Sequence, residues 1–261
     1  MEYCHRHAQA SLCESTVNKG CINRIQTDLK QIIRDPLEGI LVVSDEYRGT
    51  CCHALILGPP DTPYENGFFY LTLCFPLDYP HNPPKVTLRT TGGGRVRFNP
   101  NFYKDGTVCL SILGTWEGPS WSPVYTIGSI LLSIQSLMND KPYHNEPGFE
   151  HVDMHDHIPL GGPANYNRCI RHETMRIAII DMVDMALHGN LPGPLATAVK
   201  DSFVHNAEFL KYTCDEYSFL DGREFLDPFH TNTGTFRFLE LKRRIYQLEQ
   251  LLQIKPQKLL E

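Results

Sequence analysis

The sequence predicts an α+β domain in which a small antiparallel sheet packs against helices, with a helical extension after it. A segment with helical periodicity comes first, and four short strand-like segments joined by turn-rich connections follow it. Short connections favour an antiparallel meander, because parallel neighbours need long crossovers. A long irregular stretch and a second amphipathic segment come next. The predicted order is therefore helix, four-stranded meander, loop and helix.

Composition and charge argue against several classes of protein. The 261 residues include 41% hydrophobic and 21% charged ones, as in ordinary globular proteins. The net charge of -6 provides no basic surface for extended nucleic-acid binding, and no apolar run approaches the roughly 18 residues of a membrane helix. Nine cysteines without a C-x-x-C pair fit reduced thiols better than a disulfide framework or a zinc module. We therefore expect a monomer of the cytoplasm and nucleus that binds neither membranes nor nucleic acids.

The first predicted helix covers residues 17–34, after a loosely structured segment at residues 1–16. Its apolar residues recur at helical spacing: Ile22, Ile25, Leu29, Ile32 and Ile33. The residues off that face are mostly basic: Lys19, Arg24, Lys30 and Arg34. Asp35-Pro36 ends the helix, because proline disfavours a helical conformation in the residue before it.

Four strands are predicted, at residues 40–43, 52–57, 68–75 and 86–90. The third strand alternates large apolar residues with more polar ones. The apolar set is Phe69, Leu71, Leu73 and Phe75, and the residues between them are Tyr70, Thr72 and Cys74. This alternation predicts a sheet with one buried face.

An irregular stretch runs from Gly92 past Trp121, and a loop this long within a compact domain is usually functional or disordered. Thr126 is suited to cap the helix that follows it. The apolar residues of that helix share one face: Ile127, Ile130, Leu131, Ile134, Leu137 and Met138. We expect this helix to lie across the sheet.

The C-terminal part is predicted to be helical over residues 166–185, 195–217 and 236–252, with a break at residues 189–194. The break divides the chain into a core domain of residues 17–188 and a helical extension of residues 189–261.

Cys109 is the sharpest candidate for chemistry. It follows a glycine-bearing turn in the irregular stretch, where a thiol is exposed enough to react. A lone cysteine is more often a small buried hydrophobe, so the residue type alone does not assign a function. The surrounding motifs decide between these interpretations.

Several short motifs surround Cys109 in a fixed order. They are Gly58-Pro59, Pro63-Tyr64, Gly67, Phe75-Pro76, Tyr79-Pro80, Pro83-Pro84-Lys85-Val86, Pro100-Asn101 and Trp121-Ser122-Pro123. In order and spacing they resemble the ubiquitin-conjugating (UBC) family over roughly residues 22–148. The resemblance implies the UBC fold and a carrier that accepts ubiquitin from an activating enzyme as a thioester on Cys109. The carrier then passes ubiquitin to a substrate lysine or a ligase.

Longer continuous segments resemble the Z-type members of this family. They are residues 96–103, 109–116, 142–150 and 169–174, together with the long helical tail. This narrower resemblance implies a carrier for ubiquitin and also for a tandem-fold ubiquitin-like modifier.

The implied chemistry needs an accessible thiolate and no metal or nucleotide at the site. Transfer of an acyl group between thioesters is nearly energy-neutral, and cysteine is nucleophilic at its ordinary pKa of about 8.5. No G-x-x-x-x-G-K-[ST] phosphate loop is present. We therefore expect no cofactor at the site, and we expect the activating enzyme to use the ATP.

Asn101 matches the asparagine of the family. Its amide either stabilises the tetrahedral oxyanion, a contact worth roughly 3 kcal/mol in other enzymes, or braces the loop through backbone hydrogen bonds. Asn99 stands where the family usually has a histidine thought to be structural. Ser111 stands where many members have aspartate, so an acidic contribution from that point is absent.

His144, Asn145 and Glu146 resemble the gate opposite the family's cysteine. Glu146 either orients an incoming lysine, whose pKa falls on desolvation, or is a solvated loop carboxylate. His144 is a second candidate, as a general base.

Two contact surfaces are implied by the resemblance. Lys19, Arg24 and Lys30 resemble the surface that meets the activating enzyme, although a solvated helix face gives the same pattern. The residues that resemble the ligase-docking loops are His81, Pro83, Ser122 and Pro123. His81 replaces the large apolar anchor of many members, so the class of ligase is not determined.

A histidine-rich and aspartate-rich segment also raises the question of a metal. Its members are His151, Asp153, His155, Asp156 and His157. No helix fixes their geometry, so a polar surface loop is predicted and no metal site. Two other functions stay open: a silent UBC-like adaptor, and a thiol protease using Cys109 and His144, although no protease signature is present.

Overall fold

The computed structural model describes residues 19–152 and 162–253, so the predicted N-terminal segment at residues 1–16 lies outside the described residues. The first half contains α2 (Lys19–Arg34), β1 (Ile40–Ser44), β2 (Cys51–Leu57), β3 (Phe68–Cys74), β4 (Lys85–Leu88), η2 (Ser111–Leu113), α3 (Ile127–Ser136) and η3 (Pro142–Asn145). The second half contains α4 (Pro163–Glu173), η4 (Thr174–Asp181), α5 (Met182–Leu187), α6 (Gly193–Glu216), η5 (Ser218–Leu220), β5 (Glu224–Leu226), β6 (Thr233–Thr235) and α7 (Phe238–Gln253).

The four N-terminal strands form one antiparallel sheet in the order β1-β2-β3-β4. The predicted α+β class and the meander are confirmed. Each strand lies within about two residues of its predicted bounds, because the short turn-rich connections leave little freedom for another pairing.

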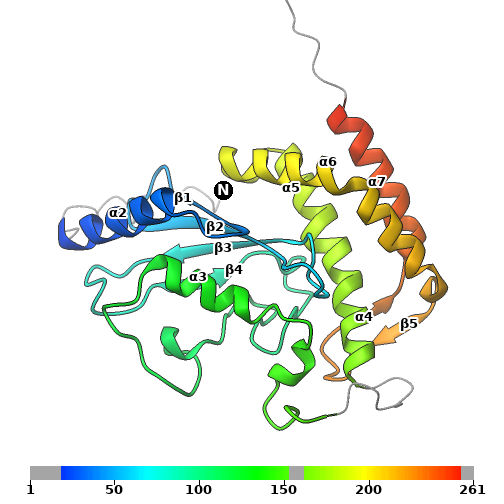
Figure 1. Ribbon diagram of the computed structural model, residues 1–261, viewed down its shortest axis with the longest axis horizontal. Helices are drawn as coiled ribbons and strands as arrows, with labels where there is room; N and C mark the ends of the chain where they lie inside the picture. The colour runs from blue at the N-terminus through cyan, green and yellow to red at the C-terminus, as the bar shows by residue number, and fades with distance from the viewer. Residues whose placement is uncertain (1–18, 153–161, 254–261) are drawn as a thin grey trace, which may run out of the picture.

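Helix α3 lies across one face of the sheet, as predicted (Figure 1). Its first turn is capped by Thr126. The Thr126 hydroxyl accepts from the N–H of Ser129 at 3.2 Å, and the Ser129 hydroxyl accepts from the N–H of Thr126 at 2.7 Å. This reciprocal pair satisfies two backbone donors that a helix start leaves unpaired. The buried face of α3 joins the first core, formed with one face of the sheet and α2.

The prediction that the sheet has one buried face is wrong. Phe69, Leu71 and Leu73 pack into the first core, while Phe68 and Tyr70 on the opposite face are also buried. The C-terminal helices cover this second face and form a second core with it. Burial of one such aromatic side chain stabilises the fold by about 1.5–3 kcal/mol. Sequence alternation did not reveal this cover, because its source lies more than a hundred residues away.

A single helical run, α4–η4–α5, lies between the two cores (Figure 1). Tyr166 and Ile170 belong to the first core, and Met175 and Ile179 belong to the second. The predicted helix at residues 166–185 is present, with a π-helical segment in the middle. The run therefore ties the sheet to the C-terminal elements.

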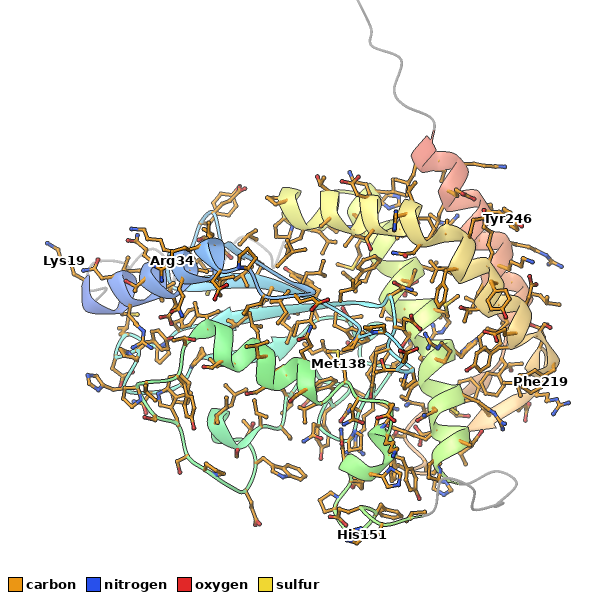
Figure 2. All side chains as sticks on the ribbon, in the orientation of Figure 1. Lys19, Arg34, Met138, His151, Phe219 and Tyr246 are labelled. Carbon is orange, nitrogen blue, oxygen red and sulfur yellow. The ribbon has the colours of Figure 1, made fainter. Side chains whose placement is uncertain are left out.

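The segment beyond Gly189 consists of α6 and α7 packed together, with a short hairpin of β5 and β6 between them. The hairpin was not predicted. Figure 2 shows Phe219 and Tyr246 on the outer side of this region, away from the sheet, and both are exposed. The division of the chain at residue 189 stays a prediction.

Asp28 joins α2 to α3 and to the loop after β3. Only 2% of it is exposed, and its carboxylate accepts from Arg24 Nε at 2.8 Å, the Tyr79 hydroxyl at 2.7 Å and the Ile127 N–H at 3.2 Å. Asp28→Ala should therefore lower the free energy of unfolding by about 3 kcal/mol, because it leaves buried donors unpaired. Urea denaturation measures the loss.

The matched control for Asp28 is Asp35→Ala, at an exposed position just after the same helix. It should change stability by less than about 0.5 kcal/mol. Equal losses in the two variants would contradict the structural role of Asp28.

Candidate active site

Cys109 lies at the end of a loop that folds back on the edge strand β4. A single bridge joins Thr87 of β4 to Thr107 of the loop. Gly106 turns the chain at φ +88°, where a Cβ would lie 2.4 Å from a main-chain oxygen of β4. Glycine is therefore required at this turn. The backbone N–H of Cys109 then donates to the Asn101 carbonyl at 2.9 Å.

The side chain of Asn101 forms a second hydrogen bond with Cys109. Its Nδ2 donates to the carbonyl of Cys109 at 3.0 Å. Its Oδ1 is buried and has no hydrogen-bond partner within residues 19–152 and 162–253. Of the two roles that the sequence leaves open for Asn101, the bracing contact is the one formed in this structure.

Asn99 holds the start of the loop in place. It is fully buried, and its Nδ2 donates to the Tyr64 hydroxyl at 2.8 Å and to the Leu137 carbonyl at 2.9 Å. Its Oδ1 accepts from the backbone N–H of Asn101 at 2.9 Å. Asn99 therefore joins the β2–β3 connection, the end of α3 and the loop that carries Cys109.

The thiol of Cys109 is more buried than the sequence suggests, with 7% of the residue exposed. This burial raises the pKa of Cys109, because a thiolate loses its hydration there. Arg97 acts in the opposite direction and favours the thiolate, while Asp105 adds to the rise.

Arg97 is a charged residue beside the loop of Cys109 that the sequence did not indicate as part of the site. Its Nη2 donates to the Pro100 carbonyl at 2.6 Å and to Glu146 Oε2 at 3.2 Å. Its guanidinium also lies over the ring of Tyr103, 4.5 Å from the centroid. The sequence does not indicate this neighbour of Cys109, because nothing in the local pattern shows which way the Arg97 side chain turns.

The structure connects Asn145 and Glu146 to the loop of Cys109. Asn145 Nδ2 donates to the Leu137 carbonyl at 3.0 Å and to Asn99 Oδ1 at 3.3 Å. Glu146 is the ionic partner of Arg97. Both predicted gate residues therefore meet the residues that hold or surround Cys109, and their roles in transfer stay predictions.

His144 is directed differently. Its Nε2 donates to the Val152 carbonyl at 2.8 Å, and its Nδ1 is buried without a hydrogen-bond partner in the described part of the chain. The imidazole thus fastens the segment after η3. Its role as a general base stays a prediction.

Comparison with known proteins assigns the family. The model of the ubiquitin-conjugating enzyme family matches residues 24–156, which include Asn101, Cys109 and the gate. Ubiquitin-conjugating enzyme E2 Z of Danio rerio is 48% identical over 235 residues, covering 90% of this chain and 70% of the relative. The E2 Z of Xenopus tropicalis is 44% identical over 251 residues, covering 96% of this chain and 78% of the relative. This chain belongs to the ubiquitin-conjugating enzyme family.

Among solved structures, human ubiquitin-conjugating enzyme E2 G1 is 34% identical, with 48% of this chain and 98% of that chain covered and a TM-score of 0.41.

Family membership confirms the resemblance found in the sequence. The protein is a transferase of the ubiquitin conjugation pathway that works through a cysteine thioester. Its partners are ubiquitin, a ubiquitin-activating enzyme and ubiquitin ligases. The silent adaptor and the thiol protease are therefore set aside.

The three basic residues of α2 that were predicted to contact the activating enzyme differ in how free their side chains are. Lys19 and Lys30 are exposed, and Figure 2 shows Lys19 at the end of α2 far from the C-terminal helices. Arg24 instead donates to the carbonyls of Pro123 and Tyr125 at 2.9 and 2.7 Å. Its guanidinium is engaged within the chain, so Lys19 and Lys30 are the better candidates for contact with this partner.

The two predicted ligase loops lie side by side. Trp121 Nε1 donates to the Pro80 carbonyl at 2.8 Å and so joins the loop of Ser122 to the loop of His81. His81 and Pro123 are exposed, while Pro83 and Ser122 are half-buried. Val124 adds an apolar side chain that is 76% exposed. Ligase contact at these residues stays a prediction.

Within residues 19–152 and 162–253, no group of three or more histidine, cysteine or acidic side chains could hold a metal ion. His151 is described and exposed, while Asp153, His155, Asp156 and His157 lie outside the described residues. The described helices also include none that is long and apolar enough to cross a membrane.

The burial of Cys109 predicts an alkaline pH profile for its alkylation. Because burial raises its pKa, the thiolate fraction of Cys109 should still increase at a pH above the ordinary thiol pKa of about 8.5. The rate of alkylation by iodoacetamide should therefore keep rising at that pH. Mass spectrometry of the Cys109 peptide after brief exposure measures the rate.

Cys74 provides an internal reference for this measurement. The Cys51 thiol donates to its sulfur at 2.9 Å and lowers the pKa of Cys74 to about 6. Cys74 should therefore react at neutral pH in the same sample. A Cys109 profile that levels off near neutral pH would contradict the effect of burial.

Proposed function

We propose that Cys109 is the cysteine that carries the modifier. The observation that supports this most directly is the pair of hydrogen bonds between Cys109 and Asn101, which fixes the backbone of this residue. Four other described cysteines are fully buried in the two cores: Cys21, Cys52, Cys169 and Cys214. Cys51 and Cys74 face each other across two paired strands of the sheet.

The proposed transfer has two acyl-exchange steps. The Cys109 thiolate attacks the carbonyl carbon of the thioester between activating enzyme and modifier, a C–S bond forms on Cys109, and the enzyme's sulfur leaves as a thiolate. A substrate amine or a ligase thiolate then attacks the new thioester. The Cys109 sulfur leaves as a thiolate, and an attacking amine gives up a proton to solvent. Arg97 favours the charged sulfur in both steps.

Glu146 is proposed to orient the incoming lysine. Its Oε2 accepts from Arg97 at 3.2 Å, and its other carboxylate oxygen accepts from the substrate amine. Desolvation between the gate and the loop of Cys109 would lower the pKa of that amine and free its lone pair.

The finer features of the function are also proposals. We propose that the protein accepts a tandem-fold ubiquitin-like modifier besides ubiquitin, because its similarity to the E2 Z relatives extends through the C-terminal helices. We further propose a monomer of the cytoplasm and nucleus that binds no nucleic acid and no membrane. No cofactor is needed at Cys109, since the activating enzyme uses the ATP.

Replacement of Cys109 by serine should change the chemistry of the adduct. Incubated with activating enzyme, ATP and modifier, the unmodified chain should give a shifted band on a gel without reductant, and dithiothreitol should remove it. Cys109→Ser should give a band that resists dithiothreitol, because an oxyester is not cleaved by thiol exchange.

The control for this experiment is Cys74→Ser, which removes the thiol that faces Cys51 in the sheet. It should form the same labile band as the unmodified chain. A labile adduct that persists in Cys109→Ser would assign the thioester to another cysteine.

Asn101→Ala tests which role the amide of Asn101 has. As a brace, Asn101 holds the Cys109 carbonyl, so its loss should lower stability by about 1–2 kcal/mol. It should also slow charging and discharge by similar factors, because both steps need the same loop. Thermal unfolding and single-turnover assays with free lysine measure these effects.

The alternative role gives a different pattern. An oxyanion donor would leave charging nearly intact and slow discharge to lysine by about 100-fold or more. That selective loss, with unchanged stability, would contradict the bracing role.

A further inference from the structure

A tight turn between β5 and β6 is organised by the side chain of Asp227, which is 1% exposed. Its Oδ1 accepts from the N–H groups of Phe229 and Thr231 at 3.0 and 2.9 Å. Its Oδ2 accepts from the Thr231 hydroxyl at 2.6 Å and the Asn232 N–H at 2.7 Å. The backbone N–H of Asp227 also donates to the Asn232 carbonyl at 2.9 Å. These hydrogen bonds restrict the turn to a single conformation.

Asn232 lies in this turn, and its side chain forms hydrogen bonds with the backbone of Arg97. Arg97 N–H donates to Asn232 Oδ1 at 2.9 Å, and Asn232 Nδ2 donates to the Arg97 carbonyl at 2.8 Å. The side-chain amide thus pairs with Arg97 as a neighbouring strand would. Asn232 is 3% exposed, so water cannot readily replace either bond.

The same turn also contacts the gate segment. The Phe229 ring stacks on Tyr143 with centroids 4.9 Å apart and meets Tyr166 edge-on at 5.1 Å. Tyr143 belongs to η3, which ends directly before Glu146. One turn of the C-terminal region therefore binds the backbone of Arg97 and, through Phe229, packs on the η3 segment that precedes Glu146.

We propose that Asn232 is a positioning residue of the transfer reaction: by fixing the backbone of Arg97, it holds the guanidinium on Pro100 and Glu146, beside the loop of Cys109. This inference rests on the proposed function of Cys109. It means that the C-terminal region completes the active site, in addition to covering the sheet.

The charged groups acting on Cys109 make the proposal measurable. Arg97 favours the thiolate of Cys109, and Asp105 disfavours it. Loss of the two hydrogen bonds between Asn232 and the Arg97 backbone should therefore shift the alkylation profile of Cys109 to higher pH. A residue that only supported the fold would lower stability without moving this profile.

The experiment compares Asn232→Ala and Arg97→Gln in the full chain. Each should slow iodoacetamide alkylation of Cys109 at neutral pH by about threefold, the effect expected when one partly screened cation is withdrawn. The double variant should be no slower than Arg97→Gln alone, because both changes act through one guanidinium. Cys74 in the same samples should react at its usual rate.

Asn206→Ala is the matched control. Asn206 lies in α6 and donates to the Ser202 carbonyl of the same helix at 2.9 Å. Its replacement should leave the Cys109 profile unchanged. If Asn232→Ala does not fold, Asn232→Ser shortens the side chain so that it no longer reaches both backbone groups of Arg97 and adds no charge, so it should show the same slowing.

Two results would overturn the proposal: a destabilised Asn232 variant with an unchanged Cys109 profile, or a slowing by Asn232→Ala that persists on the Arg97→Gln background. Alkylation needs neither modifier nor activating enzyme, so this result is independent of charging. The adduct formed by Cys109→Ser decides the proposed function separately.

Discussion

The buried amide of Asn99 is the contact on which the active site depends. It joins Tyr64 from the β2–β3 connection, Leu137 after α3, Asn101 in the loop and Asn145 at the gate. An amide has both donors and an acceptor, so one side chain can pair with unlike groups from several segments. In this low-dielectric interior an unpaired partner would cost about 1–3 kcal/mol. The segments around Cys109 therefore hold one another in a single arrangement.

The second constraint is the cover over the far face of the sheet. Phe68 and Tyr70 are buried because the C-terminal elements cover this face, with η4 packed on β3 and α6 packed on β1. The C-terminal region is thereby fixed to the sheet, and its β5–β6 turn is carried to the loop that holds Cys109. Because this packing is rigid, it keeps Asn232 within hydrogen-bond distance of the Arg97 backbone.

At Cys109, burial and charge act against each other. Burial favours the neutral thiol, which limits unwanted reaction, while Arg97 favours the thiolate that transfer requires. The two effects come from different parts of the chain. Arg97 also binds Glu146, so one cation joins the loop of Cys109 to the gate segment.

The sequence alone determined the elements of the core, the Thr126 cap and the position of Cys109 after Asn101. These features depend on local periodicity, local hydrogen bonds and motif spacing, which one segment of chain contains entirely. Tertiary structure decided that the sheet is buried on both faces, that Arg97 lies near Cys109, and that Asn232 binds Arg97. These contacts join residues far apart along the chain. These contacts form only when the two cores have packed. The folded chain, and not the local sequence, decides where each side chain points and which residues it meets.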